Sequence, residues 1–146
     1  GETINTPSML AVEDALDGLR WADGVGGLDG LIARTDANFK AIERWVTETS
    51  WVDFLAVDPA TRSPTSVCLK IVDSRIVDLP KERQSAFIKD LTGRLTEEAV
   101  AYDIAAYRDA PPGLRIWAGA TIETADLEAL MPWLDWSFEQ TRLQFA

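Results

Sequence analysis

The stretch from Tyr107 to Arg115 carries the side chains best suited to binding a small anion. It reads Tyr-Arg-Asp-Ala-Pro-Pro-Gly-Leu-Arg, so that Arg108 and Arg115 flank a Pro-Pro-Gly turn. A guanidinium group binds carboxylate or phosphate through paired hydrogen bonds, and a stiff turn holds it without a large ordering cost. Two arginines across such a turn could grip both ends of a small dianion.

Structural roles for the same two arginines stay open on the residues alone, and they are the favoured interpretation at this point. Arg108 stands beside Asp109 and could form a surface ion pair, which contributes little to stability. Arg115 could extend its charged end into water from the edge of a strand.

Several other kinds of chemistry are excluded or disfavoured within this chain. Histidine is absent from all 146 residues, which excludes a serine–histidine–aspartate triad, a cysteine–histidine pair and histidine metal sites. The acidic pairs Glu13–Asp14 and Glu97–Glu98 predict solvated helix faces, because adjacent residues on a helix point apart. The one cysteine, Cys68, lies in an apolar run and predicts a small buried side chain rather than a nucleophile.

Composition and charge restrict the partners. The chain has 24 acidic against 14 basic residues and a net charge of −10, which argues against a nucleic-acid partner but not against small anionic substrates. No apolar run approaches the roughly 20 residues of a membrane span, and the first residues do not have the pattern of a signal peptide. With one cysteine, no internal disulfide forms. These observations predict a cytoplasmic protein with no membrane partner.

The elements that must position the arginines follow from hydrophobic periodicity. We expect a helix over 7–23, with Thr6 as its cap and Pro7 at its first position, and a neighbouring second helix across a short glycine connection. The other expected elements are helices over 28–48, from 78–80 onward and from 124 to the end, and strands over 51–55, 67–72, 100–106 and 113–118. The strand at 67–72 has two largely apolar faces. The order α-α-β-β-α-β-β-α predicts an α+β fold, with a small, mostly antiparallel sheet covered by helices on one side.

Three segments are similar to phosphoserine aminotransferase, in the branch common in alphaproteobacteria, and the likeness runs in register along the whole chain. They are Gly-Glu-Thr-Ile-Asn-Thr-Pro-Ser-Met-Leu at 1–10, Asp-Pro-Ala-Thr-Arg-Ser at 58–63, and Arg-Asp-Ala-Pro-Pro-Gly-Leu-Arg-Ile-Trp at 108–117. The resemblance implies the small C-terminal domain of a fold-type I enzyme that depends on pyridoxal 5′-phosphate. Such an enzyme is a homodimer in serine biosynthesis, which converts 3-phosphohydroxypyruvate and glutamate to phosphoserine and 2-oxoglutarate.

The resemblance also implies roles for individual residues. Asn5 and Thr6 would bind the cofactor phosphate of the other subunit of the homodimer. Arg115 matches the arginine that binds the substrate α-carboxylate, and Arg108 matches one that faces the substrate's distal phosphate. Tyr107 stands where some members of the family have a histidine.

The residues that the family uses for its central chemistry would lie upstream of residue 1. The four lysines, Lys40, Lys70, Lys81 and Lys89, do not lie in the motif of the Schiff-base lysine, so we expect no catalytic residue, no metal site and no cofactor bound to this chain alone. Residues 1–6 are interpreted as a loosely ordered linker from the missing cofactor domain, and residues 7–146 as the small domain.

Two alternatives to this interpretation remain open. The chain could be the small domain of another fold-type I enzyme, such as a serine–glyoxylate aminotransferase or a cysteine desulfurase, although the two-arginine turn favours a phosphorylated substrate. It could also be a stand-alone ligand-sensing module with a ferredoxin-like sheet.

Overall fold

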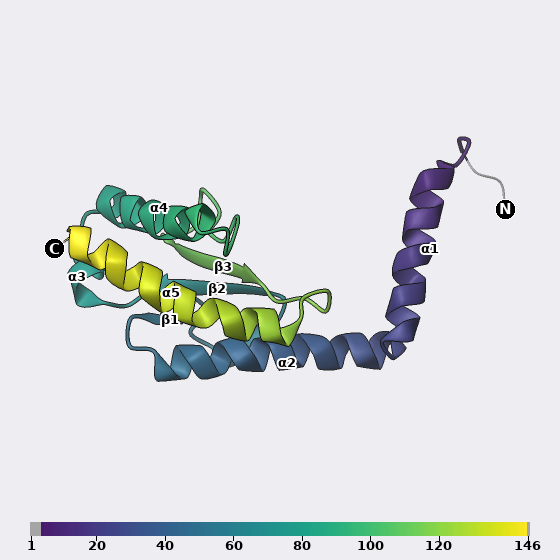
Figure 1. Ribbon diagram of the computed structural model, residues 1–146, viewed down its shortest axis with the longest axis horizontal. Helices are drawn as coiled ribbons and strands as arrows, with labels where there is room; N and C mark the ends of the chain where they lie inside the picture. The colour runs from purple at the N-terminus through teal and green to yellow at the C-terminus, as the bar shows by residue number, and fades with distance from the viewer. Residues whose placement is uncertain (1–3, 146) are drawn as a thin grey trace.

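The computed structural model describes residues 4–145, and its order of helices and strands largely follows the hydrophobic pattern (Figure 1). The elements are α1 (Met9–Gly24), α2 (Gly27–Glu48), β1 (Val52–Phe54), the short 3-10 helix η1 (Pro59–Thr61), β2 (Ser66–Ile71), α3 (Ser74–Val77), α4 (Lys81–Glu97), β3 (Gly113–Trp117) and α5 (Thr124–Phe145). The predicted α+β class is therefore confirmed.

The three strands form an antiparallel sheet in the order β1-β2-β3. Along β2, Val67, Leu69 and Ile71 are buried, whereas Cys68 lies on the opposite face and is exposed. The prediction of two apolar faces for this strand, and of a buried Cys68, is wrong. Successive residues of a strand point to opposite faces, and here helices cover one face only.

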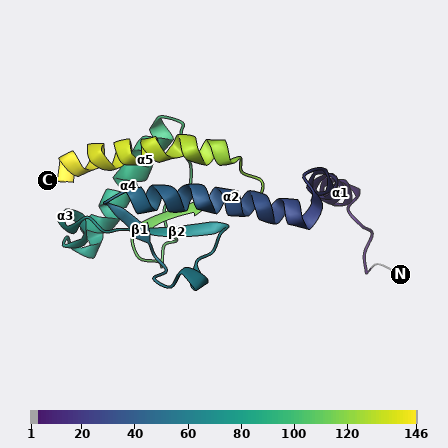
Figure 2. The same ribbon diagram turned by 90° about the horizontal axis from the view of Figure 1, so that it is seen from below.

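Helices α2, α4 and α5 lie on the buried face of the sheet (Figures 1 and 2). Helix α5 lies between α2 and α4 and contacts both. Its Phe138 stacks on Trp51, which precedes β1, with ring centroids 4.3 Å apart, and meets Phe87 of α4 edge-on. These aromatic contacts join α4, α5 and the residue before β1 into one core.

The predicted strand over 100–106 is not formed as such. This segment makes a single bridge, between Ala105 and Leu114, and two flanking backbone hydrogen bonds to β3. Ala99 and Asp103 have positive φ angles of 56° and 53°, in the left-handed region that interrupts an extended strand. Ala101 and Ile104 are nevertheless buried, so the apolar residues that suggested a strand pack into the core from an irregular segment.

The start of the chain also differs from expectation. Residues 1–3 of the predicted linker lie outside the described residues. The cap of α1 is Ser8 rather than Thr6: its hydroxyl accepts the backbone N–H of Ala11, so the helix begins two residues after Pro7. Gly26, at φ 103°, is the N-cap residue of α2 and turns the chain sharply. Helix α1 consequently stands away from the body and meets α2 near this junction, instead of packing along it (Figure 1).

The connection from β2 to α4 contains one helix more than the sequence predicts. Asp73 caps the short helix α3 by accepting from the backbone N–H of Arg75. The Arg75 guanidinium also donates to the same carboxylate, which lowers the pKa of Asp73 below its usual value. Helix α4 then begins at Lys81, directly after Pro80, close to the predicted start.

A buried amide joins α2 to the connection between β3 and α5. The Asn38 side chain is fully buried, and its Nδ2 donates to the carbonyl oxygens of Ala118, Gly119 and Ile122 at 3.2, 3.1 and 2.9 Å. Its Oδ1 accepts from the Thr124 hydroxyl at 2.7 Å, at the first residue of α5. The amide has two hydrogens, so the three carbonyl oxygens share them; with the Thr124 hydroxyl, one side chain contacts four polar groups of a tight connection at the start of α5.

Replacing Asn38 with alanine is expected to destabilise the fold by about 2–4 kcal/mol, because buried carbonyl groups lose their donor and a cavity forms. Urea unfolding followed by tryptophan fluorescence measures this change. Asp36→Ala, at an exposed position of the same helix, is the matched control and should change the stability by less than about 0.5 kcal/mol. Equal effects of the two substitutions would contradict the assigned role of Asn38.

Candidate functional site

The segment that carries the two arginines is rigid for local reasons. The backbone N–H of Ala110 donates to the carbonyl oxygen of Tyr107 at 2.9 Å, which closes a tight turn around Arg108. Pro111 and Pro112 follow, and Gly113 opens β3 opposite Lys70. A Cβ atom on Gly113 would lie 2.2 Å from the Leu69 carbonyl oxygen, so the close approach of the two strands requires glycine here.

Arg115 lies on β3 and is held from two sides. One terminal nitrogen donates to the Asp103 carboxylate at 3.3 Å, and the guanidinium carbon lies 4.4 Å from the centre of the Tyr107 ring. The arginine side chain is 15% exposed, whereas that of Asp103 is 93% exposed. Water therefore weakens this ion pair, and the position of Arg115 depends on packing as well as charge.

The Nε of Arg115 is buried and has no hydrogen-bond partner among residues 4–145. A buried unpaired N–H is costly, and such groups often mark a place where a ligand binds. Arg115, one of the two arginines that the sequence singles out, is thus held in place by its neighbours and has an unused hydrogen-bond donor.

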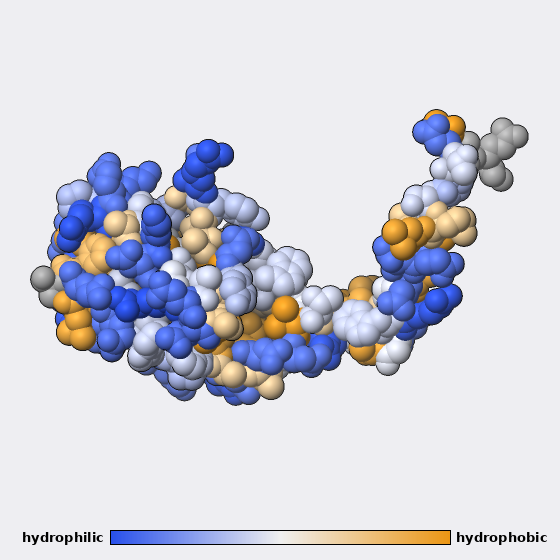
Figure 3. Space-filling view, turned by 45° about the horizontal axis from the view of Figure 1, so that its top comes forward, coloured by the Kyte–Doolittle hydropathy of each residue, from blue (hydrophilic) through white to orange (hydrophobic). Residues whose placement is uncertain are grey.

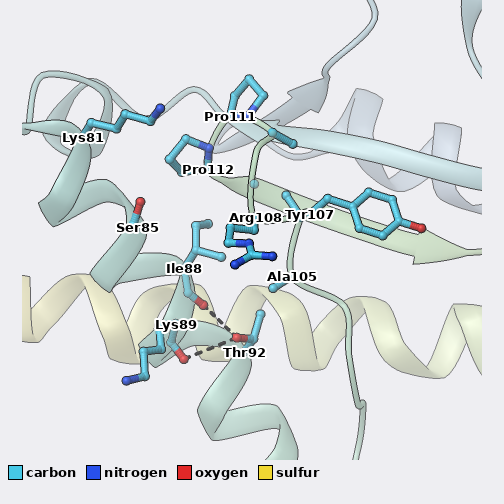
Figure 4. Close-up of a pocket in the computed structure, with 13 residues that line it drawn as sticks. Lys81, Ser85, Ile88, Lys89, Thr92, Ala105, Tyr107, Arg108, Pro111 and Pro112 are labelled. Atoms are coloured by element: carbon cyan, nitrogen blue, oxygen red, sulfur yellow. Dashed lines mark hydrogen bonds between the residues drawn. The ribbon is translucent and has the colours of Figure 1, made fainter.

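Arg108 is exposed and does not lie beside Arg115 in one pocket. Its side chain lies in an open pocket between α4 and the 105–113 segment, with a volume of about 290 Å³ (Figure 4). Helix α4 contributes Lys81, Ser85 and Ile88 to the lining, and the turn contributes Pro112. No sequence pattern predicts Lys81 or Ser85 at this site, because more than twenty residues separate them from Arg108.

The structure does not bring all the predicted site residues together. Arg115 is not part of the pocket that contains Arg108. Asn5 and Thr6 are exposed and belong to no helix or strand. They precede α1, whose start lies at the opposite end of the molecule from the β3 turn (Figure 1).

The remaining chemical groups give no competing site. Lys70 lies on the open face of the sheet, 3.9 Å from the Asp53 carboxylate. In the part of the chain that the structure describes, no three acidic or cysteine side chains are grouped as metal ligands. Within the same residues, none of the helices has the length and hydropathy needed to cross a bilayer.

Comparisons with known proteins agree with the sequence motifs. No family model matches the chain. The chain is 52% identical over 95% of its length to a phosphoserine aminotransferase from Methanosarcina mazei, and 51% identical over 94% to one from Methanosarcina barkeri. It spans about a third (35%) of the length of each of these relatives.

Solved structures give the same picture for the fold. The phosphoserine aminotransferase from Bacillus circulans subsp. alkalophilus superposes with a TM-score of 0.76 at 17% identity, over 93% of this chain and 34% of that one. A phosphoserine aminotransferase studied for radiation damage of its Schiff base superposes with a TM-score of 0.75 at 15% identity, over 93% and 35%.

The fold is therefore that of part of an aminotransferase. The sequence identity specifies which aminotransferase the chain resembles: the predicted resemblance to phosphoserine aminotransferase is confirmed over nearly the whole chain.

The packing of Tyr107 on Arg115 predicts a measurable change in the mobility of the arginine. Tyr107→Ala is expected to speed solvent exchange of the Arg115 Nε–H about fivefold, since a cation–π contact of about 1 kcal/mol is lost. Nitrogen-15 NMR of the arginine side chains measures this exchange. Tyr107→Phe keeps the ring and should leave the rate unchanged, and equal acceleration in both variants would show that the ring does not cover the guanidinium.

Proposed function

We propose that this chain is the C-terminal small domain of a phosphoserine aminotransferase that depends on pyridoxal 5′-phosphate. The whole enzyme would convert 3-phosphohydroxypyruvate and glutamate to phosphoserine and 2-oxoglutarate, as a cytoplasmic homodimer in serine biosynthesis. The observation that carries the proposal is the 52% identity over 95% of the chain to the Methanosarcina mazei enzyme. A phosphorylated substrate also suits an exposed Arg108 and an ordered Arg115.

Helix α1 supports the proposal that a larger domain is missing. Residues 1–6 would link to that domain, and residues 7–146 would form the small domain. None of the α1 side chains is buried, although Met9, Val12, Leu16 and Leu19 recur at the spacing of one helix face. Figure 3 shows hydrophobic side chains along this projecting helix. Such a face is costly in water, and the remaining two thirds of the enzyme offers a partner to cover it.

The residues present fit one part of a cofactor site. Asn5 and Thr6 have exposed side chains, and amide and hydroxyl groups readily donate hydrogen bonds to phosphate oxygens. We infer that they bind the cofactor phosphate of the neighbouring subunit in the homodimer, which accounts for their distance from the arginines of their own chain. Pyridoxal phosphate, when bound, supplies the electron sink for transfer of the amino group.

The two arginines would orient the substrate. Arg115 would bind the α-carboxylate, because it is ordered by Tyr107 and Asp103 and offers a buried N–H that still needs an acceptor. Arg108 would bind the distal phosphate, because its guanidinium lies in the pocket beside α4, which Arg115 does not line. Placing the two anionic ends in different sites fixes the orientation of a substrate that has both.

Substitution of Arg115 tests the carboxylate assignment in the full-length enzyme. Arg115→Lys should lower kcat/KM for phosphoserine and glutamate by similar factors, roughly 30-fold or more, since a lysine cannot reproduce the planar pair of donors. Single-turnover kinetics with each amino acid measure the two half-reactions. Unchanged rates would show that Arg115 has a structural role.

Substitution of Arg108 tests the phosphate assignment. Arg108→Ala should reduce kcat/KM for phosphoserine more than for glutamate, changing the ratio of the two by about tenfold or more, because glutamate has no phosphate to lose contact with. Equal losses for both amino acids would remove this assignment. Lys40→Gln, on the exposed side of α2, serves as the control for a general change of charge.

The position of the Schiff-base lysine outside this chain gives a third prediction. When the 146-residue chain alone is mixed with pyridoxal phosphate and reduced with borohydride, peptide mapping should find scattered, substoichiometric labelling of its lysines. Phosphoserine should not be turned over. One stoichiometric, phosphoserine-sensitive adduct would contradict the prediction. Lys70, which lies within strand β2, is the lysine to examine first.

A further inference from the structure

The pocket next to Arg108 is unusual in its charge. Its lining contains three cationic side chains, Lys81, Lys89 and Arg108, and no carboxylate. The chain as a whole carries 24 acidic residues against 14 basic ones. Two other, larger grooves contain both signs of charge: Glu43 and Asp53 beside Arg44 and Arg62 in one, Asp90 and Glu97 beside Lys89 and Arg94 in the other. The Arg108 pocket is thus locally positive on an acidic protein.

These cations are also without ion-pair partners in the described part of the chain. The seven ion pairs found among residues 4–145 involve six arginines and Lys70, and none of them involves Lys81, Lys89 or Arg108. Asp109 and Glu82 are next to two of the cations in the sequence, but neither lines the pocket. The two cations that face the pocket, Lys81 and Arg108, repel each other, and an anion bound between them removes this cost.

The orientation of the side chains favours one end of the pocket. Figure 4 shows the Lys81 side chain extending toward Pro111 and Pro112, with the Ser85 hydroxyl one turn further along the same helix face. The amine of Lys89 turns away from the pocket, so that this residue contributes mainly its aliphatic stem. Lys81, Ser85 and Arg108 therefore supply the donors, and Ile88 with the two prolines supplies an apolar wall.

The size of the pocket limits the ligand. A volume of about 290 Å³ is just below the usual range for small-molecule sites, roughly 300–1,000 Å³. It suits a phosphate group on a short carbon chain better than a nucleotide. A lysine, a hydroxyl and an arginine around one concavity offer the donors that phosphate oxygens require.

We propose that Lys81 and Ser85 of α4 join Arg108 in a single phosphate-binding site of this chain, which takes a small phosphate monoester or inorganic phosphate. Its link to phosphoserine rests on the proposed function, whereas the binding of phosphate to the pocket does not. The site makes α4 a determinant of substrate specificity, through two residues that the sequence motif does not contain.

Titration of the 146-residue chain with inorganic phosphate, followed by NMR, tests the site directly. Backbone signals of residues 81–92 and 107–113 should shift, and O-phospho-L-serine should shift the same signals, whereas L-serine should not. The dissociation constant for phosphate should rise about two- to fivefold in Lys81→Gln and about twofold in Ser85→Ala. Lys40→Gln removes the same charge from α2 and should change it less than either.

The outcomes separate this proposal from the proposed function. Absence of phosphate-dependent shifts in these two segments, or equal effects of Lys81→Gln and Lys40→Gln, would overturn the site. In the full-length enzyme, Lys81→Gln should reduce kcat/KM for phosphoserine about two- to fivefold more than for glutamate. If the titration succeeds but the enzyme does not transaminate phosphoserine, the proposed function fails and the phosphate site stands. If Arg108→Ala changes the ratio of kcat/KM for the two amino acids and Lys81→Gln does not, the proposed function stands and the role of Lys81 in the phosphate site fails.

Discussion

The buried side chain of Asn38 fixes the relation between the long helix α2 and everything that follows the sheet. Its amide donates to carbonyl oxygens on both sides of the turn that leaves β3, and its oxygen accepts from the first residue of α5. One turn earlier on α2, the Nε of Arg34 donates to the Ala120 carbonyl oxygen at 2.8 Å. An irregular connection could not be buried without such partners, because its backbone groups would lose their hydrogen bonds to water. The position of α5, and with it the aromatic core, follows from this junction.

The placement of the arginines depends on a different constraint, a steric one, at the first residue of β3. Gly113 allows the chain to pass within van der Waals distance of the Leu69 carbonyl group, and it thereby sets the register in which Arg115 lies opposite Cys68. Tyr107 then covers Arg115, while the tight turn that follows directs Arg108 toward α4. Among residues 4–145, helices cover one face of the sheet, and Arg115 lies opposite Cys68 on the other face with its side chain 15% exposed.

Helix α1 and residues 4–8 before it contribute no buried side chain to the core of this chain. Their apolar side chains are exposed, and their polar groups lie far from the arginines. Both properties are expected of a segment whose contacts are made by other parts of a longer protein, and the relatives are about three times as long as this chain. The chain is only 15–17% identical to the solved structures on which it superposes. Its packing has to be kept, but many sequences provide it.

Local sequence determined most elements of the fold. Alternation along 66–71, the helical stripes of α2 and α4, the glycines after α1 and the Pro-Pro-Gly turn each have a local physical cause, and each lies within a few residues of its predicted place. The motif around Arg108 and Arg115 likewise indicated the family that the comparisons then matched. Tertiary structure decided what local patterns could not. It decided that 100–106 bends through the left-handed Asp103 instead of forming a strand, and that Cys68 faces outward. It also separated the two arginines and placed Lys81 and Ser85 beside one of them, because contacts between α4 and a turn more than twenty residues later depend on the packing of the whole core.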